Sequence, residues 1–429
     1  MSTFTAAVAS ALRGPDWLRA RRAAAAERFA ALSLPTESEE IWRYSRISSL
    51  DLDAYAPADP TGPSAGGDGT AILAQLEPVI ALAGDRAAVA VAHNGRLVHV
   101  EVDPALAARG LVVADIAGLD DGEELLDATA PDDRDAFGEL NDAFFDGVVV
   151  VRVPAGLDVD RPVVVFHWID GEGLAVFPRT LVDAGPDSGV TVLEHQGSAD
   201  VAAFVDPVVE VRAAQAARVS YLNLQDLGPR VWQVGHQLSD VGRDATLHSS
   251  VVALGGSYAR VRTDSRISGQ GGTAELTAVY FADGDRMHDF RTLQDHAAPS
   301  STSDLLFKGA VQDRGRSVYS GLIRVRKEAR GTNAFQTNRN LVLTEGAEAS
   351  SVPNLEIDTN DVKCSHASAV GPIDEDQRYY LETRGIPPAV VERLIVLGFF
   401  GEVLDRLPTP SLVGSLRNTL AGRLATGRS

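Results

Sequence analysis

Cys364 and His366 are the pair of residues in this sequence whose types and spacing could bind a metal ion. Two positions apart in an extended segment, their side chains project to the same face of the chain. A thiolate and an imidazole on one side can donate to the same iron, copper or zinc ion. The same pattern also fits a buried structural cysteine beside a surface histidine, and without further context this second interpretation is favoured.

The cysteine count limits what this pair can do alone. Cys364 is the one cysteine in 429 residues, so the chain cannot close an internal disulfide, which fits a reducing compartment. Iron–sulphur clusters are usually held by four cysteine or histidine ligands. Any cluster role must therefore be shared with another chain or use nitrogen and oxygen ligands.

Common catalytic signatures are absent from the sequence. It contains no G-x-x-x-x-G-K-[ST] loop, no H-E-x-x-H motif and no cysteine pair for a zinc ribbon. The three lysines, Lys308, Lys327 and Lys363, leave little choice for a Schiff-base site.

The composition describes an acidic protein without membrane or secretion signals. The 59 acidic and 39 basic residues give a net charge of −20, which argues against binding to nucleic acid or to an anionic membrane surface. No run of about 18 apolar residues occurs, and the amino terminus lacks the parts of a secretory signal. We expect a cytoplasmic protein, and its length suggests two or three structural units.

The elements that must position Cys364 and His366 have a regular spacing. In the second part of the chain, short runs rich in Val, Thr, Ser and Leu alternate with turn residues that recur every ~15 residues. The turn residues are Gly256, Gly271, Gly284, Pro299, Gly315, Gly331 and Gly346. This period predicts a mainly β fold, a parallel β-helix over 146–370 with two-strand coils of about 30 residues. A β-sandwich of hairpins competes, but its strands recur at roughly 8–12 residues.

Helical and mixed regions precede the predicted solenoid. Residues 1–55 are expected to be helical, 56–70 to be a linker rich in Pro and Gly, and 71–145 to be a mixed α/β segment. In the mixed segment, two alternating runs from Ala88 to Val102 surround His93-Asn94-Gly95. Asn-Gly at this place favours a type I′ hairpin turn.

Residues 371–429 are predicted to be a helical domain that covers an end of the solenoid. Asp374 with Gln377 is similar to a capping box, Gly385 suits the end of that helix, and Pro388 suits the start of another. The expected apolar stripe of the second helix is Val390, Val391, Leu394, Ile395, Leu397 and Phe399. A last segment repeats leucine every fourth residue, at Leu412, Leu416, Leu420 and Leu424.

Several segments, spread over most of the chain, carry a resemblance to a known family. They are RGTNAFQTNRNLVL (330–343), DVKCSHASAVGPIDEDQRYYLETRG (361–385), GFFGEVL (398–404), EEIWRY (39–44), LNDAFFDGVVVVRVPAG (140–156) and the segment 178–194. Together they resemble the SufB/SufD family of iron–sulphur cluster assembly proteins, most strongly from 330 to 405. EEIWRY is similar to the amino-terminal mark of the SufD branch. A SufB-like chain is the sister alternative, but more cysteines and a longer amino-terminal region would be expected of it.

The resemblance implies a right-handed parallel β-helix flanked by helical parts, in agreement with the period. It further implies a non-catalytic scaffold subunit, not an enzyme, that pairs with a SufB-like subunit through the β-helices and docks the ABC-type ATPase SufC on its C-terminal helices. The partner-binding residues are then expected among Tyr379, Leu381, Arg384, Gly385, Leu394, Leu397, Gly398 and Phe399.

The resemblance also implies a role for the Cys-x-His pair close to the SufB partner. His366 is the stronger candidate metal ligand and Cys364 a supporting one, at a site shared with that partner. We expect no cofactor bound stably by this chain alone, and a transient iron ion or cluster at the interface. Two alternatives stay open: a plain homodimer, and a β-helix carbohydrate-active enzyme. The enzyme would need clustered carboxylates, or a calcium site with a basic residue, on one face.

Overall fold

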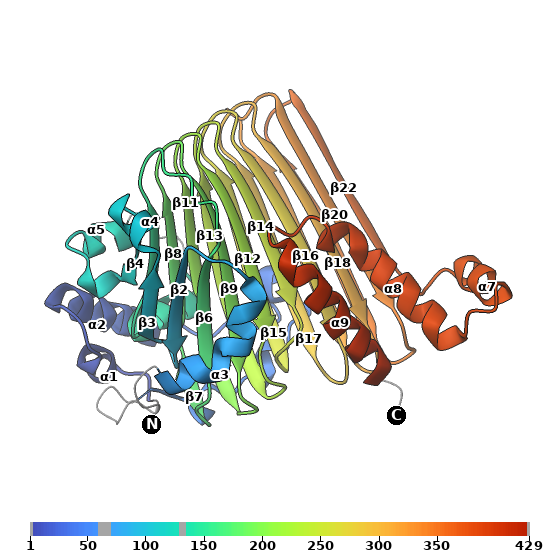
Figure 1. Cartoon of the computed structure of the whole chain (residues 1–429), viewed down its shortest axis with the longest axis horizontal. Coiled ribbons are helices and arrows are strands. Elements are labelled where there is room, and N and C mark those ends of the chain that lie inside the picture. Colours follow the sequence, from blue (N-terminus) through green and yellow to red (C-terminus); the bar gives the residue numbers. More distant parts are fainter. Residues whose placement is uncertain (1–2, 59–69, 128–133, 427–429) are drawn as a thin grey trace.

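A parallel β-helix forms the centre of the molecule in the computed structural model, which describes residues 3–58, 70–127 and 134–426 (Figure 1). The chain winds through two sheets: between residues 218 and 371 consecutive strands lie in opposite sheets, and neighbouring strands of one sheet are parallel. One row of register partners runs Val163, Val192, Tyr221, Ser249, Leu276, Leu305, Gln336, His366. Neighbours in this row are roughly 30 residues apart in the chain, the period of a solenoid coil. The predicted β-helix and its coil length are therefore confirmed.

Within the described residues, one sheet has twelve strands and the other ten. The main path of the twelve-stranded sheet consists of β4 (Val112–Asp115), β5 (Val149–Val153), β8 (Arg179–Ala184), β11 (Val208–Ala213), β13 (Val231–Val241), β15 (Tyr258–Ile267), β17 (Met287–His296), β19 (Arg316–Val325) and β21 (Glu348–Ile357). Short β1 (Ala56–Pro57), β7 (Leu174–Val176) and β10 (Ala203–Val205) pair beside that path. The ten-stranded sheet consists of β3 (Arg96–Val102), β2 (Ala88–His93), β6 (Val163–Ile169), β9 (Gly189–Ser198), β12 (Arg218–Asp226), β14 (Thr246–Ala253), β16 (Thr273–Ala282), β18 (Thr302–Val311), β20 (Thr332–Val342) and β22 (Val362–Gly371).

The periodic turn residues lie in the connections between strands, as predicted. Gly256, Gly271, Gly284 and Gly331 adopt positive φ angles of 81°, 74°, 60° and 73°, a region where a side chain is unfavourable. The hairpin between β2 and β3 is also confirmed, because the φ angles of Asn94 and Gly95 are 48° and 87°. Positive φ at both central residues is what a type I′ turn requires.

Alternate side chains of each strand point into the space between the two sheets, here called the lumen. In the first coils the lumen is aliphatic, with Val151, Val165 and Val192 fully buried. In later coils it becomes aromatic and polar. The Tyr280 hydroxyl donates to Asn340 Oδ1 (2.7 Å) and accepts from Asn338 Nδ2 (2.9 Å). Hydrogen bonding between distant coils satisfies these buried polar groups.

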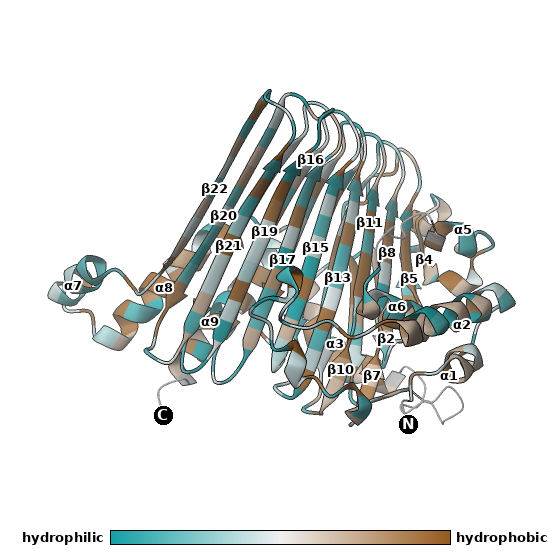
Figure 2. Ribbon diagram, turned by 180° about the vertical axis from the view of Figure 1, so that it is seen from behind, coloured by the Kyte–Doolittle hydropathy of each residue, from teal (hydrophilic) through white to brown (hydrophobic). Residues whose placement is uncertain are grey.

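Helices cover the outer faces of both sheets (Figures 1 and 2). α1 (Ala6–Ala11), α2 (Asp16–Ala31) and α6 (Ala136–Phe144) share an apolar core with the twelve-stranded sheet. α3 (Thr70–Ile80), α8 (Pro388–Leu404) and α9 (Pro410–Thr426) share another with the ten-stranded sheet. The remaining helical elements are α4 (Pro104–Ala108), α5 (Gly122–Asp127), α7 (Glu375–Thr383) and the 3-10 turns Glu40–Trp42, Ile47–Ser49, Leu52–Ala54, Ala81–Ala83 and Ile116–Gly118. Most of the predicted linker 56–70 lies outside the described residues.

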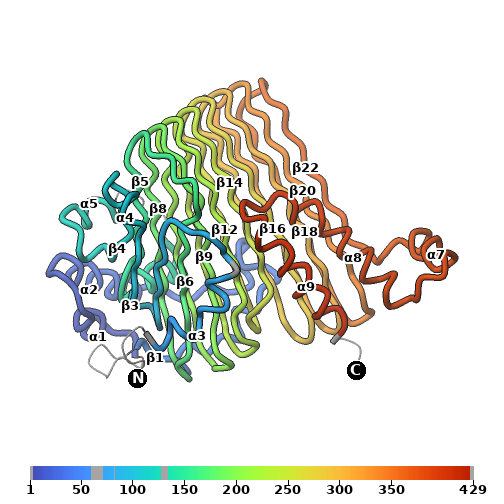
Figure 3. The backbone as a smooth tube through the Cα atoms, viewed as in Figure 1, coloured from blue at the N-terminus to red at the C-terminus, as the bar shows by residue number. Residues whose placement is uncertain are grey.

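The C-terminal helices do not cover the end of the solenoid, so that prediction is wrong. α8 and α9 lie across the face of the ten-stranded sheet, and α7 extends beyond the last coil (Figures 1 and 3). The face that α8 buries also differs from the expected stripe: it consists of Val391, Val396, Phe400, Val403 and Leu404, while Leu394 is 47% exposed. The outer face of the sheet attracts α8 because it is itself apolar, with Phe281 and Leu306 in the shared core.

Candidate functional site

Cys364 and His366 lie on the last strand of the ten-stranded sheet, β22, on the side that faces the lumen. Their register partners in β20 are Ala334 and Gln336, which are 0% and 1% exposed. Since register partners in adjacent parallel strands share a face, Cys364 and His366 point to the same side. The expectation that i, i+2 spacing brings them to one face agrees with this register.

The two residues differ in their surroundings. Cys364 is partly buried and packs against an apolar cluster that includes Ile323 and Ala334. Burial raises the pKa of the Cys364 thiol above its usual value, so the uncharged thiol is favoured near neutral pH. His366 is exposed. Among the described residues, no group of three or more His, Cys, Asp or Glu side chains could hold a metal ion. The pair therefore offers at most two ligands, and further ligands have to come from another molecule.

The coil that carries the pair is uncovered. β21 and β22 are the terminal strands of the two sheets along their main paths, and most of their side chains are exposed or half-exposed. Five exposed apolar side chains lie on or beside them: Phe335, Val352, Leu355, Ile357 and Val370. We call these five residues, together with Cys364 and His366, the last-coil surface. Open strand edges and exposed apolar groups together are typical of a surface that pairs with another chain.

Sequence reasoning missed the five apolar members of the last-coil surface. In the sequence they look like interior residues of strands. Val352, Leu355, Ile357 and Val370 lie on β21 and β22, which have no next coil, and Phe335 lies on β20 beside Ser365 of β22. No local pattern reveals this exposure. The one available signal was the end of the β pattern near Pro372, directly after the Cys-x-His pair.

The second candidate surface is formed by α7 and the first half of α8. Asp374 caps α7, because its carboxylate accepts from the backbone amides of Asp376 (2.9 Å) and Gln377 (3.2 Å). Gly385 has a φ of 80° directly after the helix. The predicted start and end of this helix are confirmed. An open groove of about 420 Å³ lies between the two helices and is lined by Asp376, Gln377, Tyr380, Leu381 and Ile395.

The eight residues expected to bind a partner divide into two groups. Tyr379 (71% exposed), Leu394, Arg384, Gly385 and Gly398 are exposed, and Leu381 lines the groove. Leu397 and Phe399, in contrast, pack partly against the core shared by α8 and the ten-stranded sheet. The structure therefore leaves the first group accessible to another protein, whereas the second helps to fix α8 on its own sheet.

The EEIWRY segment binds the amino-terminal region to the twelve-stranded sheet. Trp42 is buried, and the Arg260 guanidinium lies 3.8 Å from the centre of its ring. Arg260 also donates to the Ile41 carbonyl (2.8 Å), and Arg291 donates to the Arg43 carbonyl (2.6 Å). This segment crosses β15 and β17, so its role in the chain is structural.

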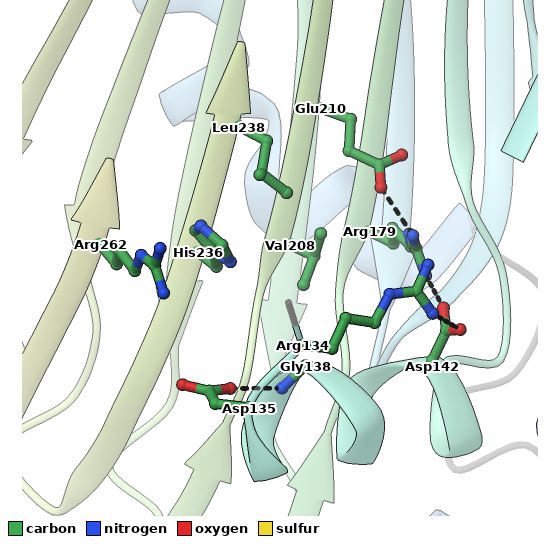
Figure 4. Close-up of a pocket in the computed structure, with 10 residues that line it drawn as sticks. All are labelled: Arg134, Asp135, Gly138, Asp142, Arg179, Val208, Glu210, His236, Leu238 and Arg262. Carbon is green, nitrogen blue, oxygen red and sulfur yellow. Dashed lines mark hydrogen bonds and ion pairs between the residues drawn. The ribbon is translucent and has the colours of Figure 1, made fainter. Parts of the chain in front are cut away.

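A small polar pocket between α6 and the twelve-stranded sheet is also structural (Figure 4). Arg179 donates to Asp142 (2.6 Å) and to Glu210 (2.7 Å). Burial opposes ionisation of Asp142, but the surrounding arginines, Arg179 first, outweigh it and lower its pKa to about 2. The pocket has about 20 Å³ of free space, enough for about one water molecule. Asp142 of α6 pairs with Arg179, and Arg179 with Glu210, so these charges hold α6 on the sheet.

Comparisons with known proteins give one consistent result. A family model described as "SUF system FeS cluster assembly, SufBD core domain" matches residues 167–399. An iron–sulfur cluster assembly SufBD family protein of Mycobacterium tuberculosis is 38% identical over 62% of this chain and 69% of its own length. The iron–sulfur cluster assembly protein SufD of Escherichia coli is 28% identical over 92% and 90% of the two chains. SufD of Bacillus subtilis is 29% identical over 63% and 62%.

No helix in the described part of the chain combines the length and the apolarity that crossing a bilayer requires.

Proposed function

The chain belongs to the SufBD family of the SUF system for iron–sulphur cluster assembly, and from this membership we propose that it is a non-catalytic scaffold subunit that acts in the cytoplasm. In this role it pairs with a SufB-like subunit, docks a SufC-like ATPase and helps iron or a nascent cluster to reach the interface with the first partner. The relatives named SufD favour this role over that of a SufB-like subunit.

The uncovered last coil is the observation that supports the proposal most. It presents two open sheet edges and has five exposed apolar side chains on or beside them. A second parallel β-helix that ends in the same way would cover these groups and continue the ladders. Cys364 and His366 would then lie inside the contact, next to side chains of the SufB-like subunit.

The iron ion or cluster is the cargo of this interface. His366 is exposed and can donate a ring nitrogen once that nitrogen is unprotonated. Cys364 must lose its proton to become a ligand, and its raised pKa opposes this until a metal or a positive group of the partner approaches. We therefore assign His366 as the first ligand from this chain and Cys364 as a supporting one. The remaining ligands come from the SufB-like subunit, and the cargo leaves after assembly.

The groove between α7 and α8 is the proposed docking surface for the SufC-like ATPase. Tyr379, Tyr380 and Leu394 are among the most exposed large hydrophobic side chains of the described residues, with exposures of 71%, 58% and 47%. Aromatic side chains at this degree of exposure are typical anchors of protein interfaces. Their position beyond the last coil leaves the last-coil surface free, so that both partners can bind at once.

Co-purification tests the assembly role. The tagged chain is expressed with SufB and SufC homologues from the same source and analysed by gel filtration. We expect one complex that contains all three chains. Val352→Asp should remove the SufB homologue and leave the SufC homologue, because it places a charge in the first contact, while Leu394→Asp should do the reverse. Elution of the wild-type chain alone would refute the proposal.

A histidine substitution tests the metal role. His366→Ala is expected to leave the complex assembled and to lower the iron and sulphide content of purified material several-fold. His248→Ala is the matched control, since His248 is a half-exposed histidine on another strand of the same sheet, β14. An unchanged iron and sulphide content in the His366 variant would make the Cys-x-His pair a structural detail, even if the complex forms.

A further inference from the structure

Lys308 is a buried charged residue in the apolar contact between α8 and the ten-stranded sheet. It is 4% exposed and lies on β18, next to Val279 of β16 in the register. Val279 and Leu306 both belong to the apolar core that α8 covers. A lysine at this place is unusual, because a buried ammonium group is stable only when it is paired and hydrogen-bonded.

All the contacts that compensate this charge come from one stretch of α8. The Lys308 ammonium donates to the Phe399 carbonyl at 2.9 Å and to the Glu402 carboxylate at 2.7 Å. It also lies 4.9 Å from the centre of the Phe399 ring. The hydrogen bond from Lys308 lowers the pKa of Glu402, so this carboxylate stays ionised near neutral pH. Glu402 is itself held by Arg406, at 3.4 Å.

The apolar side chains around Lys308 bind α8 but do not fix its position along the strands. Val396, Phe400 and Val403 can exchange one apolar neighbour for another at little cost when a helix shifts on a sheet, because the hydrophobic effect is not directional. The ion pair between Lys308 and Glu402 behaves differently, because the lysine is buried although the Glu402 side chain is 50% exposed. It adds little net stability compared with an apolar pair, but separating its partners leaves a buried charge without compensation. The pair therefore selects one position of the helix.

We propose that Lys308 is a positioning residue that fixes the register of α8 on β16 and β18. The inference rests on the proposed docking of a SufC-like ATPase on α7 and the first half of α8. A force applied to this exposed half passes along the helix to Phe399 and Glu402. There Lys308 transfers it to the strands from inside the contact, beside the exposed pair that Arg406, just after α8, forms with Asp304 of β18 (3.2 Å), whereas the apolar contacts would let α8 slide. The C-terminal part of α9 is held separately, since Arg423 donates to the Leu254 carbonyl.

Hydrogen–deuterium exchange of the full-length chain tests the register without any partner. Lys308→Met keeps the length of the side chain and removes its charge. We expect amides of the second half of α8 to exchange about tenfold faster, while α9 and the midpoint of thermal unfolding change little. Lys308→Arg should restore slow exchange, and Glu402→Gln should be intermediate. Lys327→Met is the matched control, because Lys327 is exposed in the turn after β19.

Three results would overturn the inference. These are unchanged α8 exchange in Lys308→Met, equally faster exchange in α8 and α9, and a loss of global stability that Lys308→Arg does not rescue. The first result would mean that Lys308 does not fix the position of α8. Either of the other two would mean that Lys308 only contributes to packing in general.

A second measurement adds the SufC homologue and a non-hydrolysable ATP analogue. In the wild-type complex, nucleotide should change the exchange of β16 and β18. In Lys308→Met this change should be lost while the SufC homologue still co-elutes. If the SufC homologue does not bind even the wild-type chain, the proposed docking and the force transfer are both refuted. The role of Lys308 in fixing the position of α8 is then still decided by the exchange measurements on the isolated chain. If the homologue binds and both chains respond equally, the transfer role of Lys308 is refuted.

Discussion

Acidification is expected to destabilise this protein through histidines that are buried in the lumen, of which His288 is the best example. His288 is fully buried in β17, and its Nε2 lies 3.2 Å from the Phe281 carbonyl. Burial lowers the pKa of His288 from 6.5 to about 3. The folded state therefore keeps this ring neutral at pH values where the unfolded chain protonates it.

The size of the effect follows from linkage between proton binding and folding. Because the pKa of His288 is lower in the folded state, its contribution to stability is complete above about pH 6.5 and is lost as the pH falls towards 3. A pH of 5.0 is about 1.5 units below the pKa of this imidazole in the unfolded chain. At 1.36 kcal/mol per unit, the free energy of unfolding is therefore about 2 kcal/mol lower at pH 5.0 than at neutral pH. His296, whose pKa burial lowers to about 4, is expected to contribute a similar amount.

The assay is urea unfolding at pH 7.5 and pH 5.0, with the free energy of unfolding compared between the two pH values for each protein. His288→Gln cannot be protonated, so its loss of stability between the two pH values should be about 2 kcal/mol smaller than that of the wild type. His248→Gln replaces a half-exposed histidine and should behave like the wild type. Comparing pH values within each variant cancels the packing cost of the substitution.

Equal losses in the wild type and in His288→Gln would refute this reasoning, because they would mean that the folded state protonates His288 as easily as the unfolded chain does. Should His288→Gln not fold, His296→Gln provides the same test.

Three further outcomes are expected from other side chains. Burial raises the pKa of Asp206 well above its usual value, so its contribution to stability is complete below about pH 3.8 and is lost as the pH rises towards the folded pKa; Asp206→Asn should flatten this part of the pH dependence in urea melts. Trp42→Ala should lower the free energy of unfolding by about 3–5 kcal/mol, because it empties the space between Arg260 and Phe137. Limited proteolysis should then cut the variant near residue 42, while the circular dichroism signal of the β-helix persists. Asp374→Ala should cost about 1 kcal/mol of helix stability and speed amide exchange in α7 alone, whereas unchanged exchange would mean that the cap is dispensable.

Features set by single residues and short spacings were predictable from the sequence. Gly271 and Gly331 mark turns because few other residues accept their backbone angles, and Asp374 marks a helix start because its carboxylate replaces missing backbone partners. The coil length followed from the repetition of such signals. That Cys364 and His366 point to the same side was predictable because side chains two positions apart in a strand share a face.

Features that depend on contacts between distant coils were not predictable. Tyr280 and Asn338 come from different coils and meet in the lumen, and nothing near either residue in the sequence indicates the other. The buried face of α8 was missed for a different reason. Leu394 and Val396 are both apolar and lie on different sides of a helix that is apolar nearly all round, so the sequence did not say which side meets the sheet. The position of the sheet decided it.

The unbroken register of the coils has a consequence for how the length of this protein can change. Between Val163 and His366 the strands of the ten-stranded sheet keep the same row of partners, and the small differences in coil length arise outside these paired strands. One residue added within a strand would turn every following side chain of that strand from the lumen to the outside. Natural insertions and deletions should therefore be confined to the turns, where they alter the rim of the solenoid and leave its interior unchanged. Gain or loss of larger pieces should occur in units of a whole coil.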